Sequence, residues 1–178
     1  MFTGHVRRIG RRGAAPAAAL AALGALACAA PPVQPPATRA SLERLAAAAT
    51  TDIYGRPAPL AALLADRAVL YFFRTDCRYC ASGLAAARAL AARPDAPVLV
   101  LVSREDAARL KAAVGPERPR LLVISDPGGG LMDSALVTRF VPRIIAVAGF
   151  RVLLDQTGQG GPGLEGAAEL AARRGGGR

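Results

Sequence analysis

The amino-acid sequence predicts an α/β fold in which a central mixed sheet is flanked by helices. Three apolar runs of strand length alternate with segments of helical composition, which is typical of parallel strands. These runs are Val69–Phe73, Val98–Val102 and Leu121–Ile124. Two further strand-like segments, Arg143–Val147 and Phe150–Leu154, surround Ala148-Gly149 and predict a hairpin. The sheet should therefore contain both parallel and antiparallel strands.

The first strand has a helical lead-in. We expect a short helix over Ser41–Ala49, with Ser41 as its N-cap. Asp52–Pro59 contains Gly55 and two prolines, so it reads as a turn that brings Leu60–Leu64 to the core. Val69–Phe73 is continuously apolar, as expected for a central strand buried on both faces.

The later helices connect the remaining strands. Ser103 is expected to cap the helix after the second strand, with Asp106 imitating a capping box. Val141-Pro142 should interrupt the chain before the hairpin, and Gln156–Gly163 should be a loop. Helices are expected over Cys80–Ala92, Arg104–Val114, Leu131–Phe140 and Leu164–Arg174.

The chain has 178 residues, which suffices for one domain and a leader. Its hydrophobic fraction is 52%, but much of this is alanine, so the larger apolar residues can build only one compact core. We expect an export signal at 1–27, a lipid anchor with a proline-rich tether and lead-in at 28–50, the folded domain at 51–174, and a flexible tail at 175–178.

The first 27 residues have the order of an export signal. A basic stretch that includes Arg7, Arg8, Arg11 and Arg12 precedes the apolar run 14–27, which ends in small residues around Ala25-Leu26-Ala27. The apolar run is short for a transmembrane helix, although an uncleaved anchor stays an alternative.

Cys28 follows this run directly, in a context that resembles a bacterial lipoprotein signal, so we expect lipidation there. Simple secretion, with Cys28 an incidental small residue, is the alternative. Residues 31–36 include four prolines and should form an extended, solvated spacer between the membrane and the domain.

A Cys-x-x-Cys motif, Cys77-Arg78-Tyr79-Cys80, lies where the first strand passes into a helix. Unpaired backbone N–H groups at a helix start favour a thiolate, so Cys77 is the expected nucleophile and Cys80 the resolving thiol. Arg74 and Arg78 should favour the Cys77 thiolate and Asp76 should oppose it, which leaves the redox direction open. A purely structural bridge explains the spacing poorly, because so small a loop contributes little stability.

The motif and its surroundings resemble the thioredoxin superfamily, in particular its exported TlpA/ResA-like branch. The resemblance covers about residues 51–174. The string Phe73–Cys77 with Tyr79-Cys80 is also similar to thioredoxin-like TraF proteins of conjugation systems. The segments that carry the resemblance are Asp52–Pro57, Val69–Phe73, Ile124–Pro127 and Val141-Pro142.

The resemblance implies a thioredoxin-like fold and a protein-disulfide oxidoreductase. It implies that Pro142 is a cis-proline facing the cysteines and that backbone groups of Val141 pair with an extended substrate. Arg78 and Tyr79, between the cysteines, are the other expected substrate contacts. The implied role is reductive: keeping cysteines of exported proteins reduced, with electrons from a redox partner protein and no cofactor.

Several positions depart from the family pattern. Tyr71 stands six residues before Cys77, where thioredoxins commonly have an acidic residue. Gly83 and Leu84 stand where this branch often has glutamate and then proline. The group that exchanges a proton with Cys80 is therefore unidentified.

Other functions fit the composition less well. The net charge is +10, but the basic residues mix with acidic ones and lack interleaved aromatic residues, so no nucleic-acid partner is expected. The only histidine, His5, lies in the leader, and no metal site is expected. A copper(I) carrier with two thiolates and a non-catalytic thioredoxin-like binding lipoprotein are the alternatives kept. We expect a monomer on the periplasmic side of a bacterial membrane, lipid-anchored or, alternatively, soluble.

Overall fold

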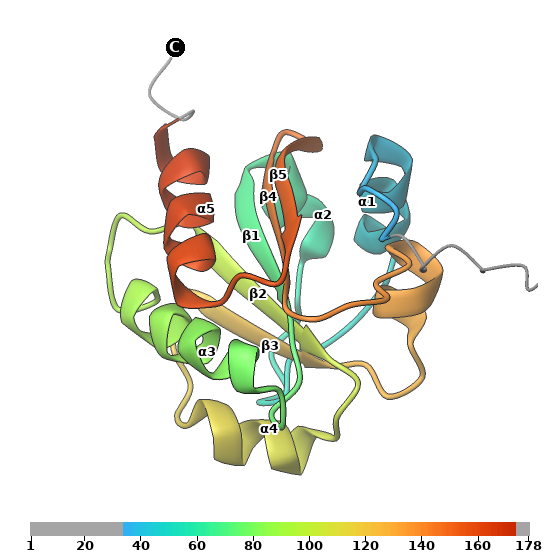
Figure 1. The fold of residues 1–178 in the computed structure, drawn as a ribbon. Helices are drawn as coiled ribbons and strands as arrows, with labels where there is room; N and C mark the ends of the chain where they lie inside the picture. Colours follow the sequence, from blue (N-terminus) through green and yellow to red (C-terminus); the bar gives the residue numbers. More distant parts are fainter. Residues whose placement is uncertain (1–33, 174–178) are drawn as a thin grey trace, which may run out of the picture. The chain divides into compact units, whose positions relative to one another are not determined.

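The structure is a computed structural model and describes residues 34–173. A five-stranded mixed sheet forms its centre, with strand order β3-β2-β1-β4-β5 (Figure 1). β1, β2 and β3 are parallel, and β4 and β5 are antiparallel to their neighbours. The expected mixed sheet is confirmed. The strands are β1 (Arg67–Phe72), β2 (Val98–Ser103), β3 (Leu121–Ser125), β4 (Arg143–Ala148) and β5 (Arg151–Thr157).

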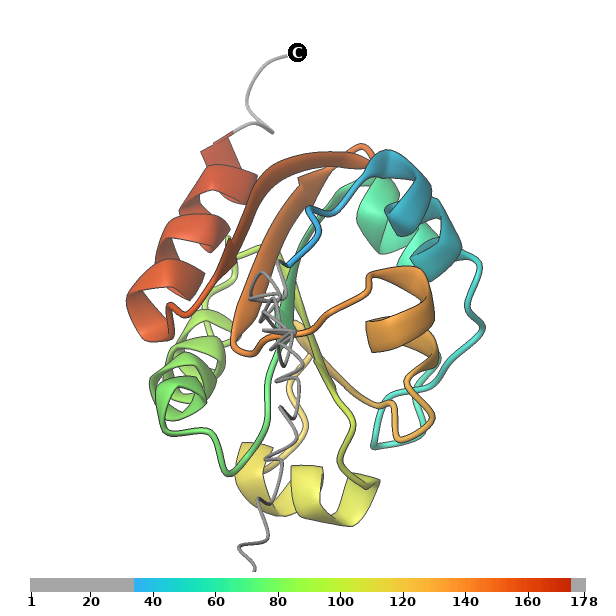
Figure 2. The same cartoon turned by 45° about the vertical axis from the view of Figure 1, so that its right-hand side comes forward.

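Helices cover both faces of the sheet (Figure 1). α3 and α5 lie on one face, with α4 beside β3, and α1, α2 and a short π-helix, η1, lie on the other (Figure 2). The helices are α1 (Arg39–Ala46), α2 (Leu60–Ala65), α3 (Arg78–Leu90), α4 (Ala107–Val114), η1 (Gly130–Ala135) and α5 (Gly161–Arg173).

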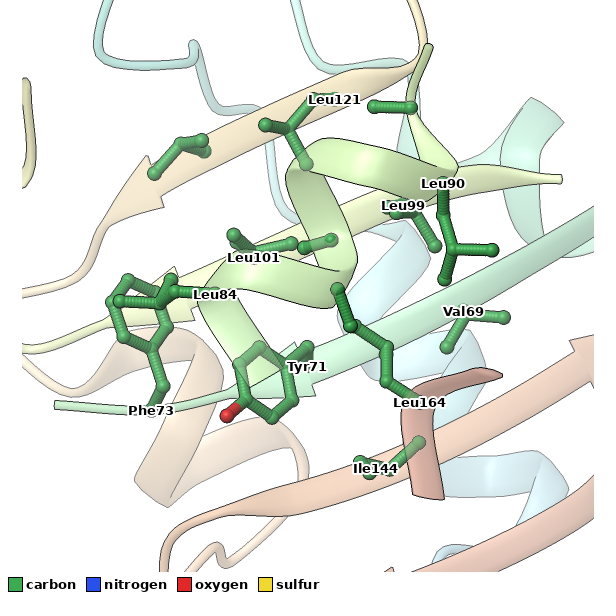
Figure 3. Packing of buried hydrophobic residues seen from close by; sticks show 14 of the residues in the cluster. Val69, Tyr71, Phe73, Leu84, Leu90, Leu99, Leu101, Leu121, Ile144 and Leu164 are labelled. Carbon is green, nitrogen blue, oxygen red and sulfur yellow. The ribbon is translucent and has the colours of Figure 1, made fainter. Parts of the chain in front are cut away.

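Strand β1 separates two apolar clusters because its side chains alternate between the faces. Val69 and Tyr71 point to the α3/α5 side, together with Phe73 just beyond the strand, and Figure 3 shows them against Leu84 and Leu164. Leu70 and Phe72 belong to the opposite cluster, and all five side chains are fully buried. Burial on both faces explains why the run is continuously apolar.

Two helix starts differ from the prediction. Thr38, not Ser41, is the N-cap of α1, and Ser41 lies at the third helical position, where the two residues form a capping box. Ser103 ends β2 instead of capping α4, and Asp106 is itself the N-cap, accepting a hydrogen bond from the Arg109 N–H. In both cases the residue directly before the first helical residue accepts from the free backbone N–H groups of the first turn.

The helix expected over Leu131–Phe140 is wrong beyond Ala135. The carboxylate of Asp126 accepts the backbone N–H groups of Leu131 and Met132 and fixes the start of η1. Val137 then has a positive φ of 51°, which a helix does not allow.

Four other element ends differ by a few residues. α3 begins at Arg78 because Cys77 is its N-cap. β5 continues to Thr157, and α5 begins at Gly161, whose N–H donates to the hydroxyl of Ser82 on α3. Phe150 belongs to the hairpin turn: it and Gly149 both have φ of 58°, as a type I′ turn requires.

The end of the proline-rich segment is docked on the domain, which contradicts a solvated spacer for residues 34–36. The Pro35 carbonyl accepts from Arg143 (2.9 Å), and the Ala37 N–H donates to Asp155 (2.6 Å). Leu42 and Leu45 of α1 are then fully buried. The folded part therefore begins well before residue 51, because these lead-in groups complete its packing and hydrogen bonding.

The predictions for residues 1–33, including the export signal and Cys28, lie outside the described residues, as does the predicted tail at 175–178. Within residues 34–173, none of the helices has the length and apolar character needed to cross a membrane.

Candidate active site

Cys77 and Cys80 lie at the carboxyl end of the central strand. β1 ends at Phe72, a short loop follows, and Cys77 is the N-cap of α3 with φ −85° and ψ 112°. The Cys80 N–H donates to the Cys77 carbonyl (2.9 Å), which places both thiols on the first turn. Cys77 is half-buried and Cys80 is fully buried, and both are free thiols. A reagent therefore reaches Cys77 first.

Tyr71 lies beneath Cys80. It is fully buried, and its hydroxyl donates to the Cys80 carbonyl (3.1 Å). A Cβ at Gly83 would overlap this hydroxyl and ring, so the residue on the next turn of α3 must be glycine. Tyr71 therefore packs in the apolar cluster and also contacts the resolving cysteine.

The buried thiol of Cys80 stays protonated at neutral pH. Burial first, and then a hydrogen bond in which the Cys80 thiol donates to Cys77, raise the pKa of Cys80 to about 12. A hydrogen bond from the backbone of Arg74 acts in the opposite direction, because it stabilises the thiolate. Cys80 therefore suits the second, intramolecular step better than the first attack.

The charged neighbours of Cys77 are engaged with other groups. Arg74 pairs with Asp76 (2.6 Å), which holds the pKa of that carboxyl below its usual value. The guanidinium of Arg78 stacks 4.5 Å from the ring centroid of Tyr79, a ring that is 54% exposed. Tyr79 therefore offers an apolar surface beside the nucleophile.

Val141 and Pro142 lie at the same edge of the sheet as the cysteines. The peptide bond between them is cis. Arg143 of β4 pairs with Phe72 of the antiparallel strand β1. Pro142, one residue before Arg143, therefore lies opposite Phe73, in the segment that leads to Cys77. Cys77 and Val141 both pack against the apolar cluster that contains Phe73. The structure thus brings the predicted nucleophile and the predicted substrate-binding loop together.

Comparisons with known proteins agree with this arrangement at the level of the fold. No family model matches the chain, and no curated protein does. Solved structures do match, and the three described below are 13–20% identical to it.

One is a secreted disulfide oxidoreductase of Mycobacterium tuberculosis, homologous to Escherichia coli DsbE (20% identity, TM-score 0.60, covering 71% of this chain and 97% of that one). Another is StoA of Bacillus subtilis (13%, TM-score 0.56, 67% and 94%). A third is an exposed lipoprotein thioredoxin, Etrx1, of Streptococcus pneumoniae (18%, TM-score 0.52, 62% and 88%).

The chain has a thioredoxin-like fold. The resemblance inferred from the Cys-x-x-Cys motif and Val141-Pro142 is confirmed at this level.

One part of this thioredoxin-like site was missed by sequence reasoning: Glu105, in the loop between β2 and α4, holds the loop before Cys77. Its carboxylate accepts from the Thr75 N–H (2.9 Å) and from the Thr75 hydroxyl (2.7 Å). Ser103 and Arg109 are further partners of the same carboxylate (3.2 and 3.1 Å). Thirty positions separate Glu105 from Thr75, so no local motif signals the contact.

Among the described residues, no cluster of three or more His, Cys, Asp or Glu side chains is arranged to hold a metal ion. Neither cysteine has a third candidate ligand there.

Proposed function

We propose that this chain is a protein-disulfide oxidoreductase that exchanges disulfides with exported proteins. The observation that carries the proposal is the pairing of a half-buried Cys77 at the start of α3 with a buried Cys80 on the same turn, with cis-Pro142 at the same edge of the sheet. The thioredoxin-like fold supports it. Arg78, Tyr79 and Val141 are the proposed substrate contacts.

The reaction has two displacement steps. The Cys77 thiolate attacks one sulfur of a substrate disulfide; the substrate S–S bond breaks, a mixed disulfide forms, and the other substrate sulfur leaves as a thiolate. Cys80 loses its proton and attacks the Cys77 sulfur, which releases the second substrate sulfur as a thiolate. The substrate gains two electrons and two protons, and the Cys77–Cys80 pair is oxidised. A dithiol partner protein then reduces it by the reverse steps.

We propose the reductive direction. Cations that stabilise the nucleophilic thiolate make such a pair more oxidising. Here Arg74 is neutralised by Asp76, and the guanidinium of Arg78 lies over Tyr79. This favours a pair that donates electrons.

We also propose an extracytoplasmic location, with Cys28 as the lipidated residue and the domain acting as a monomer. The order of residues 1–28 supports export. A secreted protein and an exposed lipoprotein among the similar structures are consistent with it. Fatty-acid labelling should be lost in Cys28→Ala; if labelling persists, the anchor is elsewhere.

Trapping of mixed disulfides tests the reaction. The full-length chain carrying Cys80→Ser should accumulate partner proteins on Cys77. Cys77→Ser should accumulate few, because Cys80 is buried and the sulfur of Cys28 is blocked by the proposed lipid. Equal trapping by the two variants would contradict the assigned roles. A binding-only domain or a copper(I) carrier would give no covalent adducts with either variant.

A further inference from the structure

We propose that an arginine-lined pocket beside Cys77 selects substrates with an acidic residue near the exchanging cysteine, and that Arg139 is the specificity-determining residue. The inference rests on the proposed thiol–disulfide exchange and names the substrate class for it.

The pocket adjoins the reaction centre on two sides. It has a volume of about 380 Å³, and four of its lining residues are arginines. Arg74 stands three residues before Cys77, and Val141 immediately precedes Pro142. A chain bound at Val141 therefore passes over this pocket. The lining residues are Arg74, Arg104, Glu105, Arg109, Met132, Thr138, Arg139 and Val141.

Carboxylates accompany three of the four arginines. Arg74 pairs with Asp76 (2.6 Å), and Arg109 pairs with Glu105 (3.1 Å). Arg104 pairs with Asp133. These pairs cancel most of the charge around the pocket.

Arg139 supplies the remaining charge. Its guanidinium has no carboxylate partner among residues 34–173, and the residue is exposed. Its backbone is fixed, because its N–H donates to the side-chain oxygen of Gln34 (2.9 Å). A held backbone with a free cationic end suits recognition of a carboxylate, to which a guanidinium can donate two parallel hydrogen bonds.

The position of Arg139 decides which part of a substrate it reads. It stands two residues before Val141, where the substrate backbone is proposed to pair. The substrate is proposed to bind as an extended chain, in which the side chains of every second residue point to the same side. A glutamate or aspartate two or three residues from the substrate cysteine would therefore lie near Arg139. Attraction of opposite charges there adds specificity and a faster encounter.

Three disulfide-bonded peptides that differ only in a Glu, Gln or Lys near the cysteine test the proposal. For any two of these peptides, the readout is the ratio of the rates at which the reduced full-length protein exchanges disulfides with them. At low salt, the Glu peptide should react about three- to tenfold faster than the Gln peptide. Arg139→Gln should bring this ratio close to one, and Arg139→Glu should favour the Lys peptide. The matched control is Arg151→Gln, an exposed arginine at the opposite end of the sheet, which should keep the wild-type ratio.

Three other outcomes would contradict either the role of Arg139 or the proposed function. An unchanged Glu-to-Gln ratio in Arg139→Gln overturns the role of Arg139. An equal loss of the ratio in Arg151→Gln overturns it too, because total charge would then be the cause. If the wild-type protein exchanges with none of the peptides, the proposed function itself fails, and this inference fails with it.

Discussion

At the scale of single residues, Tyr71 and Gly83 form a matched pair. Thioredoxin-like proteins commonly have an acidic group where this chain has Tyr71, and a phenol ring needs more room than a carboxylate. α3 provides that room through Gly83, where any Cβ would overlap the ring. Because Tyr71 is fully buried, it has no solvent-facing rotamer to adopt instead.

This pairing predicts the sign of a substitution. Alanine normally stabilises a helix by about 1 kcal/mol relative to glycine. Gly83→Ala should instead lower the free energy of unfolding by about 1 to 3 kcal/mol, because it overpacks a buried site. Gly166→Ala on α5, with no atom within 4 Å of the added Cβ, should show the normal gain. Urea denaturation of the reduced proteins compares them, and a more stable Gly83→Ala protein would refute the pairing.

The buried thiol of Cys80 predicts a dependence of stability on alkaline pH. Its pKa rises from 9.0 to about 12, chiefly by burial, so between these values the folded state holds a proton that the unfolded chain has lost. The free energy of unfolding of the reduced protein must therefore fall as pH rises through this window.

Relative to Cys80→Ser, which removes this titration, the loss should be about 1.4 kcal/mol between pH values of about 8 and 10. Denaturant unfolding without oxygen at both pH values measures it. A difference between the two proteins that does not change with pH would contradict a buried, protonated Cys80.

The candidate site was predictable where its chemistry is local. Cys77 and Cys80 are three positions apart, and Val141-Pro142 is a dipeptide, so each is visible in the sequence. The contacts of Thr75 with Glu105 and of Tyr71 with Gly83 join residues that meet only after the sheet and α3 have packed together. Sequence reasoning registered Tyr71 and Gly83 as separate departures and missed Glu105.

At the scale of elements, the parallel strands were predicted well because burial on both faces leaves an unbroken apolar run. The least accurate prediction was the helix over Leu131–Phe140. The helical segment is shorter than predicted because distant groups bind the residues that follow it. Arg143 donates to the Leu136 carbonyl (3.0 Å), and Gln34 donates to the Val137 carbonyl (2.9 Å). Local composition carries no information about such partners.

The ion pair between β4 and β5 should be a main source of order in this region. Arg143 is fully buried, and it donates to both carboxylate oxygens of Asp155 (2.9 and 2.8 Å). Removing one partner leaves a buried charge uncompensated, so Asp155→Ala should lower the free energy of unfolding by about 3 to 5 kcal/mol. Thermal or urea denaturation measures the loss.

An exposed pair provides the comparison. Glu169 lies 3.5 Å from Arg173 on the surface of α5, and Glu169→Ala should change stability by less than about 0.5 kcal/mol. Similar losses for Asp155→Ala and Glu169→Ala would mean that burial does not decide the strength of the first pair.

At the scale of the whole molecule, the N-terminal lead-in and the proposed substrate loop form one unit. Gln34 lies more than a hundred positions before this loop, yet its side-chain oxygen accepts the N–H groups of Arg139 and Phe140 (2.9 and 3.2 Å). The residue after Pro142, Arg143, donates to Pro35. The chain that leaves the proposed membrane anchor therefore positions the proposed substrate loop.

Gln34→Ala tests this coupling without altering any charge. It removes the acceptor of two loop amides, so the N–H groups of Arg139 and Phe140 should exchange with deuterium about fivefold faster, because each lost hydrogen bond is worth about 1 kcal/mol. Amides of α3 should keep their wild-type rates, and so should the alkylation of Cys77 by a small reagent, because neither depends on the loop. Gln159→Ala, an exposed glutamine before α5, is the control and should leave all of these rates unchanged. Exchange with a peptide disulfide should slow only in Gln34→Ala, since only a polypeptide uses the loop; equal peptide rates in the two variants would show that the lead-in is bound to the loop without influencing it.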